Sequence, residues 1–120
     1  MKLRILMATA AVTALSTGAA HAAGSAANGQ TIYNNQCAMC HASGIGPALG
    51  GVYGNQAAGV PGYAYSTALK NAKLTWDAAT LDKFLAAPQT AVPGTKMTFA
   101  GLTTASDRAD VIAYLATLTK

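Results

Sequence analysis

The stretch QCAMCHASGIGP, residues 36–47, holds the only two cysteines of the chain, and a histidine directly follows the second. The spacing from Cys37 through Cys40 to His41 is the C-x-x-C-H motif that attaches c-type haem. Two thiols at this spacing add across the two vinyl groups of the haem, and the imidazole that follows ligates the iron. The alternative is a redox-active dithiol, which needs a βαβ setting that this sequence does not show. We expect one haem c, bound covalently through Cys37 and Cys40, with His41 as a metal ligand.

Residues 1–22 have the three regions of a cleavable Sec-type signal peptide. MKLR is basic, ILMATAAVTAL is apolar, and small residues surround the cleavage pattern Ala20-His21-Ala22. The apolar run is shorter than the about 20 residues of a membrane-spanning helix, and an uncleaved anchor is the alternative. We expect export to the periplasm, cleavage near Ala22, no stable membrane insertion and one domain over residues 23–120.

The composition of that domain argues against two kinds of site. It contains six Lys and Arg residues and four acidic residues, and the basic residues form no run. Nucleic-acid binding therefore has little support. A structural zinc site takes four Cys or His ligands, whereas residues 23–120 offer three, all in one short stretch. A domain of about a hundred residues with long irregular segments has a thin core, and a large bound cofactor would stabilise it.

The second axial ligand of the iron follows by elimination. No second histidine lies in residues 23–120, and the two methionines there are Met39 and Met97. Met39 is held between the two cysteines on the attachment edge, whereas Met97 lies in the loop VPGTKMTFAG. We expect Met97 to ligate the iron, and the alternative is that it fills an apolar gap. Ligation by His and Met fills both axial positions and raises the reduction potential, which suits a one-electron carrier and not an enzyme.

The hydrophobic pattern predicts an all-α domain of three or four short helices joined by Gly-rich loops. One helix follows Thr75, the expected N-cap, carries apolar residues on one face and ends at Pro88. A weaker pattern predicts a helix over residues 26–36, and an apolar side predicts another over residues 105–118, with loops over residues 43–65 and 91–101. The residues expected on the apolar face of the middle helix are Leu81, Phe84 and Leu85.

Three segments, QCAMCHASGIGPALGGVYG, PGYAYSTALKNAKLTW and PGTKMTFAGLTTASDRADVIAYL, resemble the mitochondrial cytochrome c and bacterial cytochrome c2 group. The resemblance covers most of residues 27–118 and implies the class I cytochrome c fold, wrapped around one covalently attached haem. It also implies that the first and last helices cross, with Gly29 packed against Val111, Tyr114 and Leu115.

The resemblance further implies roles for four residues around the haem. The Pro47 carbonyl would accept a hydrogen bond from Nδ1 of His41 and hold the tautomer of the ring. Tyr65 and Trp76 would bind a haem propionate, although Trp76 could equally fill the core. Thr95 would support the buried propionate and the Met97 side of the pocket.

Several positions depart from that group. Asn55 stands where an arginine usually neutralises a propionate, and Ala91 replaces a common tyrosine. Leu69 and Phe84 replace an asparagine and a tyrosine of the polar network near the methionine sulfur. Of the usual ring of docking lysines only a few candidates are left, so we expect a weak dependence of partner binding on salt. These candidates are Lys70, Lys73, Lys83 and Lys96.

The sequence therefore predicts a soluble, monomeric, monohaem electron carrier of a periplasmic respiratory or photosynthetic chain. Its partners would be redox proteins: a quinol-oxidising complex or dehydrogenase as donor, and an oxidase, reductase or reaction centre as acceptor. One alternative is a permanent cytochrome subunit of a periplasmic dehydrogenase. The other is a ligand-binding or peroxidatic haem protein from which Met97 is easily displaced.

Overall fold

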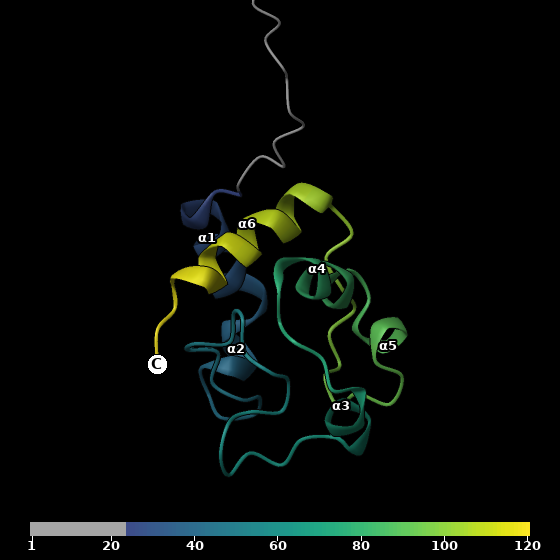
Figure 1. The fold of residues 1–120 in the computed structure, drawn as a ribbon. Helices are drawn as coiled ribbons and strands as arrows, with labels where there is room; N and C mark the ends of the chain where they lie inside the picture. Colours follow the sequence, from purple (N-terminus) through teal and green to yellow (C-terminus); the bar gives the residue numbers. More distant parts are fainter. Residues whose placement is uncertain (1–23) are drawn as a thin grey trace, which may run out of the picture.

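Most helices of this domain begin at a residue suited to start one. In the computed structural model, which describes residues 24–120, the side chains of Ser25, Ser66 and Asp77 each accept a hydrogen bond from a backbone N–H three residues on. Pro88 occupies the first turn of its helix, where a missing N–H costs nothing. The six helices, drawn in Figure 1, are α1 (Ala26–Gln36), α2 (Ala38–His41), α3 (Thr67–Ala72), α4 (Ala78–Ala86), α5 (Pro88–Ala91) and α6 (Ala105–Thr117).

The described residues contain helices and no strand, as expected for an all-α domain. The predictions for residues 26–36 and 105–118 are confirmed by α1 and α6. The signal peptide expected over residues 1–22 lies outside the described residues. Within the part that the structure describes, no helix has both the length and the apolar character needed to cross a membrane.

The N-cap predicted for the middle helix is wrong by two residues. Thr75 does not cap α4; it forms an isolated antiparallel bridge with Gln56, which keeps its backbone extended. The cap is Asp77, whose Oδ1 accepts a hydrogen bond from the N–H of Thr80 at 2.8 Å. The helix therefore begins at a position beyond Thr75, because Thr75 pairs with Gln56 in extended backbone.

The terminal helices α1 and α6 cross at Gly29, which is buried. A Cβ atom at position 29 would overlap the backbone carbonyl of Asp110 and lie 3.0 Å from Cβ of Tyr114. The expected crossing is thus present, with Asp110 and Tyr114 at the point of closest approach. The Asp110 carboxylate also accepts hydrogen bonds from the backbone of Ser25 and the side chain of Asn28, so it fixes the start of α1 on α6.

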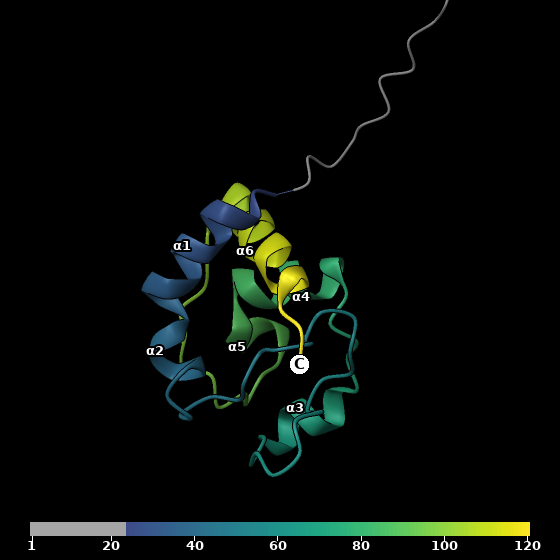
Figure 2. The same ribbon diagram turned by 90° about the vertical axis from the view of Figure 1, so that its left-hand side faces the viewer.

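The core lies beneath this crossing and is built mainly from α4 and α6. The face predicted for the middle helix is buried, and it packs with residues of α6 and of the connecting loops. Figure 2 shows α1, α4 and α6 at one end of the molecule and α3 at the other, with the long loop of residues 42–66 running between. The buried cluster consists of Trp76, Leu81, Phe84, Leu85, Val92, Leu102, Val111 and Leu115.

Candidate haem-binding site

A cavity of about 1180 Å³ lies between the end of the molecule that holds α1, α4 and α6 and the long loop of residues 42–66. This volume is somewhat larger than the about 300–1,000 Å³ that is usual for small-molecule sites. Its walls come from α2 and the loop behind it, from the loop of residues 55–66, from α4, and from residues 95–99. All eight residues proposed from the sequence as ligands or cofactor contacts line it: Cys37, Cys40, His41, Pro47, Tyr65, Trp76, Thr95 and Met97.

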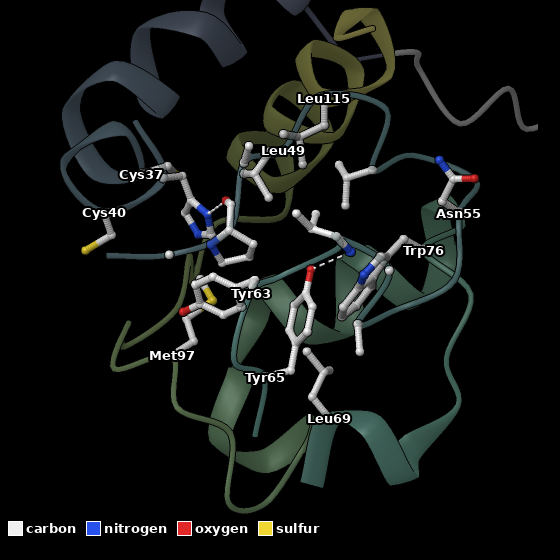
Figure 3. A pocket seen from close by; sticks show the side chains of 18 of the residues that line it. Cys37, Cys40, Leu49, Asn55, Tyr63, Tyr65, Leu69, Trp76, Met97 and Leu115 are labelled. Carbon is white, nitrogen blue, oxygen red and sulfur yellow. Dashed lines mark hydrogen bonds between the residues drawn. The ribbon is translucent and has the colours of Figure 1, made fainter. Parts of the chain in front are cut away.

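The two cysteines lie at one edge of the cavity and differ in exposure. Cys37 is buried and Cys40 is exposed, and neither is in a disulfide. Figure 3 shows the sulfur of Cys40 turned away from the other side chains drawn. Burial raises the pKa of the Cys37 thiol, and the neighbouring Cys40 thiol adds to this rise. Before haem attachment, the Cys37 thiol is therefore a weaker acid than an ordinary cysteine thiol.

His41 is oriented by the loop that follows it. Its Nδ1 lies 2.7 Å from the carbonyl oxygen of Pro47, so Nδ1 carries the proton and donates it, and Nε2 is left free as a ligand atom. The loop is closed by a second hydrogen bond, from the N–H of Gly46 to the carbonyl oxygen of Cys40 at 2.9 Å. A Cβ atom at Gly46 would lie 3.0 Å from both Cε1 and Nδ1 of the imidazole. Only glycine at position 46 lets the loop approach the ring this closely.

The Met97 segment is held by Thr95 and by Gln89, a residue that the sequence analysis missed. The N–H of Met97 donates to Oγ1 of Thr95 at 3.3 Å. The side-chain amide of Gln89, on α5, donates to the carbonyl oxygens of Met97 at 2.7 Å and of Thr95 at 3.2 Å. No local pattern could have revealed Gln89, because these bonds depend on how α5 folds back beside the loop.

Across the cavity, Tyr65 and Trp76 offer hydrogen-bond donors. Figure 3 shows Cys37 and Met97 on one side, Trp76 on the opposite side and Tyr65 between them. The Tyr65 hydroxyl accepts a hydrogen bond from the N–H of Val60 at 2.9 Å, which leaves its own proton free to donate. The indole of Trp76 packs on Phe84 with ring centroids 4.9 Å apart. Trp76 therefore fills the core and also faces the cavity.

Three of the four residues that depart from the cytochrome c and cytochrome c2 pattern line the cavity, and one lies outside it. Leu69 and Phe84 both line the cavity, so the wall near them is apolar. Asn55 also lines the cavity, and its side-chain amide donates to the Gly51 carbonyl. Ala91 lies outside this cavity and borders a separate hollow of about 220 Å³ beside Phe84.

Among the four candidate docking lysines only Lys96 lines the cavity, and its ammonium group lies 3.1 Å from the carbonyl oxygen of Ala64. Lys70 lies in the last turn of α3, Lys73 is the C-cap of that helix, and Lys83 lies in the last turn of α4. The four lysines thus do not gather on one edge of the cavity.

These features fit a haem attached at Cys37 and Cys40. The cavity is large and lined mainly by apolar side chains, His41 presents Nε2, and Met97 supplies a thioether from a different segment. Tyr65 and Trp76 supply neutral donors where the carboxylates of a porphyrin could be bound. The close approach of Gly46 to the imidazole leaves little room for the ring of His41 to turn.

Comparison with known proteins gives the same assignment. Residues 26–119 match the family model described as cytochrome c. The chain is 49% identical over 107 residues to cytochrome c2 of Rhodomicrobium vannielii, covering 84% of this chain and 85% of that protein. It is 48% identical over 100 residues to cytochrome c of Euglena viridis, covering 79% of this chain and 98% of that protein.

A solved structure agrees at the level of the fold. Cytochrome cH from Methylobacterium extorquens superimposes with a TM-score of 0.75 and 47% sequence identity, covering 78% of this chain and 99% of that one. The described domain thus has the class I cytochrome c fold, as predicted. The chain belongs to the cytochrome c family of electron carriers, which are not enzymes, and it is a monohaem c-type cytochrome with haem c bound covalently through Cys37 and Cys40.

Proposed function

We propose that this protein is a soluble periplasmic electron shuttle, with His41 and Met97 as the two axial ligands of its haem. The observation that carries the proposal is the shared cavity, which brings His41 from α2 and Met97 from residues 95–99 to the same space. When bound, the haem iron supplies a one-electron couple between the ferrous and ferric states. A protein that supplies both axial ligands leaves no iron position for a substrate.

The residues on either side of the cavity have separate tasks in this proposal. Pro47 and Gly46 hold the imidazole of His41 with Nε2 free. Thr95 and Gln89 hold the backbone on both sides of Met97, so its neutral thioether would be kept beside the haem iron, where it would favour the reduced state. Tyr65, Trp76 and Thr95 would bind the propionates, since Tyr65 and Trp76 face the cavity with donors.

The periplasmic location rests on the signal-peptide pattern of residues 1–22. The partners would be redox proteins: a quinol-oxidising complex or a dehydrogenase as donor, and an oxidase, reductase or reaction centre as acceptor. Cys40, one of the two residues that attach the haem, is exposed, which supports electron exchange with a partner protein. Electron transfer at an exposed haem edge would need no substrate pocket.

The test is to express the full chain with the haem-attachment machinery and to recover the periplasmic fraction. We expect a monomer with covalently bound haem that ascorbate reduces and ferricyanide reoxidises, each by one electron. Recovery in a stable complex with a dehydrogenase, which high salt does not dissociate, would instead make the chain a permanent subunit. Recovery in the membrane fraction would overturn the proposed location.

A further inference from the structure

Charge is distributed very unevenly along the domain. Residues 24–69 contain no Asp, Glu, Lys or Arg, and every charged side chain of residues 24–120 lies between Lys70 and Lys120. The uncharged part includes α1, α2 and the loop behind α2, which form the wall of the cavity at the cysteines. The residues of this wall carry no formal charge, His41 aside, whereas Lys120 lies against Gly51 of the loop and Lys96 lines another part of the cavity.

Two large apolar side chains project from this same surface. Met39 is 78% exposed and Ile45 is 69% exposed, the two highest values among the large hydrophobic residues that the structure describes. Met39 directly precedes the exposed Cys40, and Ile45 and Cys40 both line the cavity. The space around Gly44 is open, since a Cβ atom there would meet nothing within 4 Å.

The polar groups between these side chains are already paired within the protein. The Ser43 hydroxyl donates to the carbonyl oxygen of Met39 at 2.6 Å, and the N–H of Gly46 donates to that of Cys40 at 2.9 Å. The Tyr63 hydroxyl donates to the carbonyl oxygen of Ile45 at 2.9 Å. A partner can cover this surface without stranding these carbonyl groups, so the desolvation cost of contact is low.

We propose that Met39, Cys40, Gly44 and Ile45, here called the thioether rim, dock a redox protein whose own face around its cofactor is apolar and uncharged. This inference rests on the proposed electron-carrier function and names the class of partner. An acidic face would find no lysine on the rim, and a basic face would find no carboxylate. Lys96, on another wall of the cavity, has its ammonium group beside the Ala64 carbonyl.

The small size of the rim suits a carrier that must release its partner quickly. Two exposed apolar side chains can anchor only a weak complex, as in redox encounters that bury less than about 1,200 Å² in total. Because burial and not charge supplies the affinity, association is expected to respond little to ionic strength.

The test uses the haem-loaded protein and two blue-copper proteins as probes, one with an apolar, uncharged face around its copper site and one with an acidic patch. Stopped flow follows the transfer of one electron from the ferrous chain to Cu(II), which becomes Cu(I). The wild type should react faster with the apolar probe, and this rate should change by less than about twofold between low and high ionic strength.

Three variants add one charge each at matched apolar positions. Met39→Lys and Ile45→Lys should slow transfer to the apolar probe by at least about fivefold. Tyr53→Lys is the control, because Tyr53 is the third large exposed hydrophobic residue, at 41%, and does not line the cavity. Its rate should stay within about twofold of the wild type. A covalent haem spectrum and full reduction by ascorbate check each variant for folding.

Four results would overturn the docking proposal. One is a faster reaction with the acidic probe, and the second is a steep loss of rate with salt. The third is an equal effect of all three lysine substitutions. The fourth is a wild-type dimer that Met39→Lys dissociates, since the rim would then cover a second copy of the chain. If the wild type fails to cycle between ascorbate and ferricyanide, the electron-carrier proposal itself is wrong, whichever residues surround the edge.

Discussion

The carbonyl oxygen of Pro47 lies 2.7 Å from Nδ1 of His41, and a Cβ atom added at Gly46 would lie 3.0 Å from that same nitrogen. The hydrogen bond assigns the proton to Nδ1, and the glycine lets the loop lie close enough to make that bond. The short segment after the cysteines thus sets both the tautomer and the orientation of the expected proximal ligand.

Gly46→Ala tests this arrangement. A methyl group at position 46 would lie 3.0 Å from Cε1 and Nδ1, so either the ring or the loop must shift and the hydrogen bond to Pro47 must lengthen. A weaker hydrogen bond makes the imidazole a poorer donor to ferric iron, so we expect a higher midpoint potential. Potentiometric titration of the variant checks this. A potential and ferric spectrum identical to those of the wild type would show that the contact has no influence on the ligand.

Gln89→Glu tests the support of the Met97 segment. The amide of Gln89 donates to two carbonyl oxygens, and a carboxylate of the same shape cannot donate to either. We expect easier displacement of Met97, measured as faster binding of imidazole to the ferric protein. Thr90→Ala, at the next and exposed position of α5, is the control and should leave this rate unchanged. Equal rates in all three proteins would show that Gln89 does not support the Met97 segment.

Much of this domain could be predicted from local signals. The haem-attachment motif, the apolar face of α4 and the loop character of residues 43–65 are all visible in short windows of sequence, and the structure agrees on both helix and loop. The hydrogen bond between His41 and Pro47 was expected through the family resemblance and is present.

The sequence-based predictions are wrong or incomplete where contacts between distant segments determine the local structure. Thr75 and Asp77 are both good N-cap residues, and only the bridge between Thr75 and Gln56 selects Asp77. The helices α3 and α5 are too short to show a hydrophobic period, although Ser66 and Pro88 stand at their starts. Pro88, which the sequence predicts only as the end of the middle helix, also opens α5.

Gly29→Ala tests the crossing of the terminal helices. Alanine in an isolated helix is favoured over glycine by about 1 kcal/mol, so local propensity alone predicts a stabilised protein. The overlap with the Asp110 carbonyl predicts the reverse, a loss of about 1–3 kcal/mol in the free energy of unfolding as α1 and α6 move apart. Asn34→Ala, at an exposed position of α1, is the control and should be neutral or slightly stabilising. Denaturant titration of the three proteins decides, and a stabilised Gly29→Ala would contradict the close approach.

The pH dependence of stability should carry a contribution from Asp77. The N–H of Thr80 donates to its carboxylate and lowers the pKa of Asp77 below its ordinary value. A carboxyl group with a lowered pKa in the folded state stabilises the protein above its unfolded pKa, and this contribution is lost as the pH falls through the folded pKa. The difference in melting temperature between wild type and Asp77→Ala should therefore be full at neutral pH and shrink in acid. Asp77→Asn keeps the cap acceptor without the titration and should show no such acid-dependent loss, and parallel curves for all three proteins would exclude the effect.

Ligation of the haem iron by Met97 is tested most directly by the absorption spectrum of the purified haem-loaded protein, recorded beside that of Met97→Ala. The ferric wild type should show the weak long-wavelength band of sulfur ligation, and carbon monoxide should leave its ferrous spectrum unchanged. Met97→Ala should lose the band, bind carbon monoxide and have a lower midpoint potential. If the wild type has covalent haem but lacks the band and binds carbon monoxide, Met97 does not hold the iron, and the protein is a ligand-binding haem protein instead of an electron shuttle.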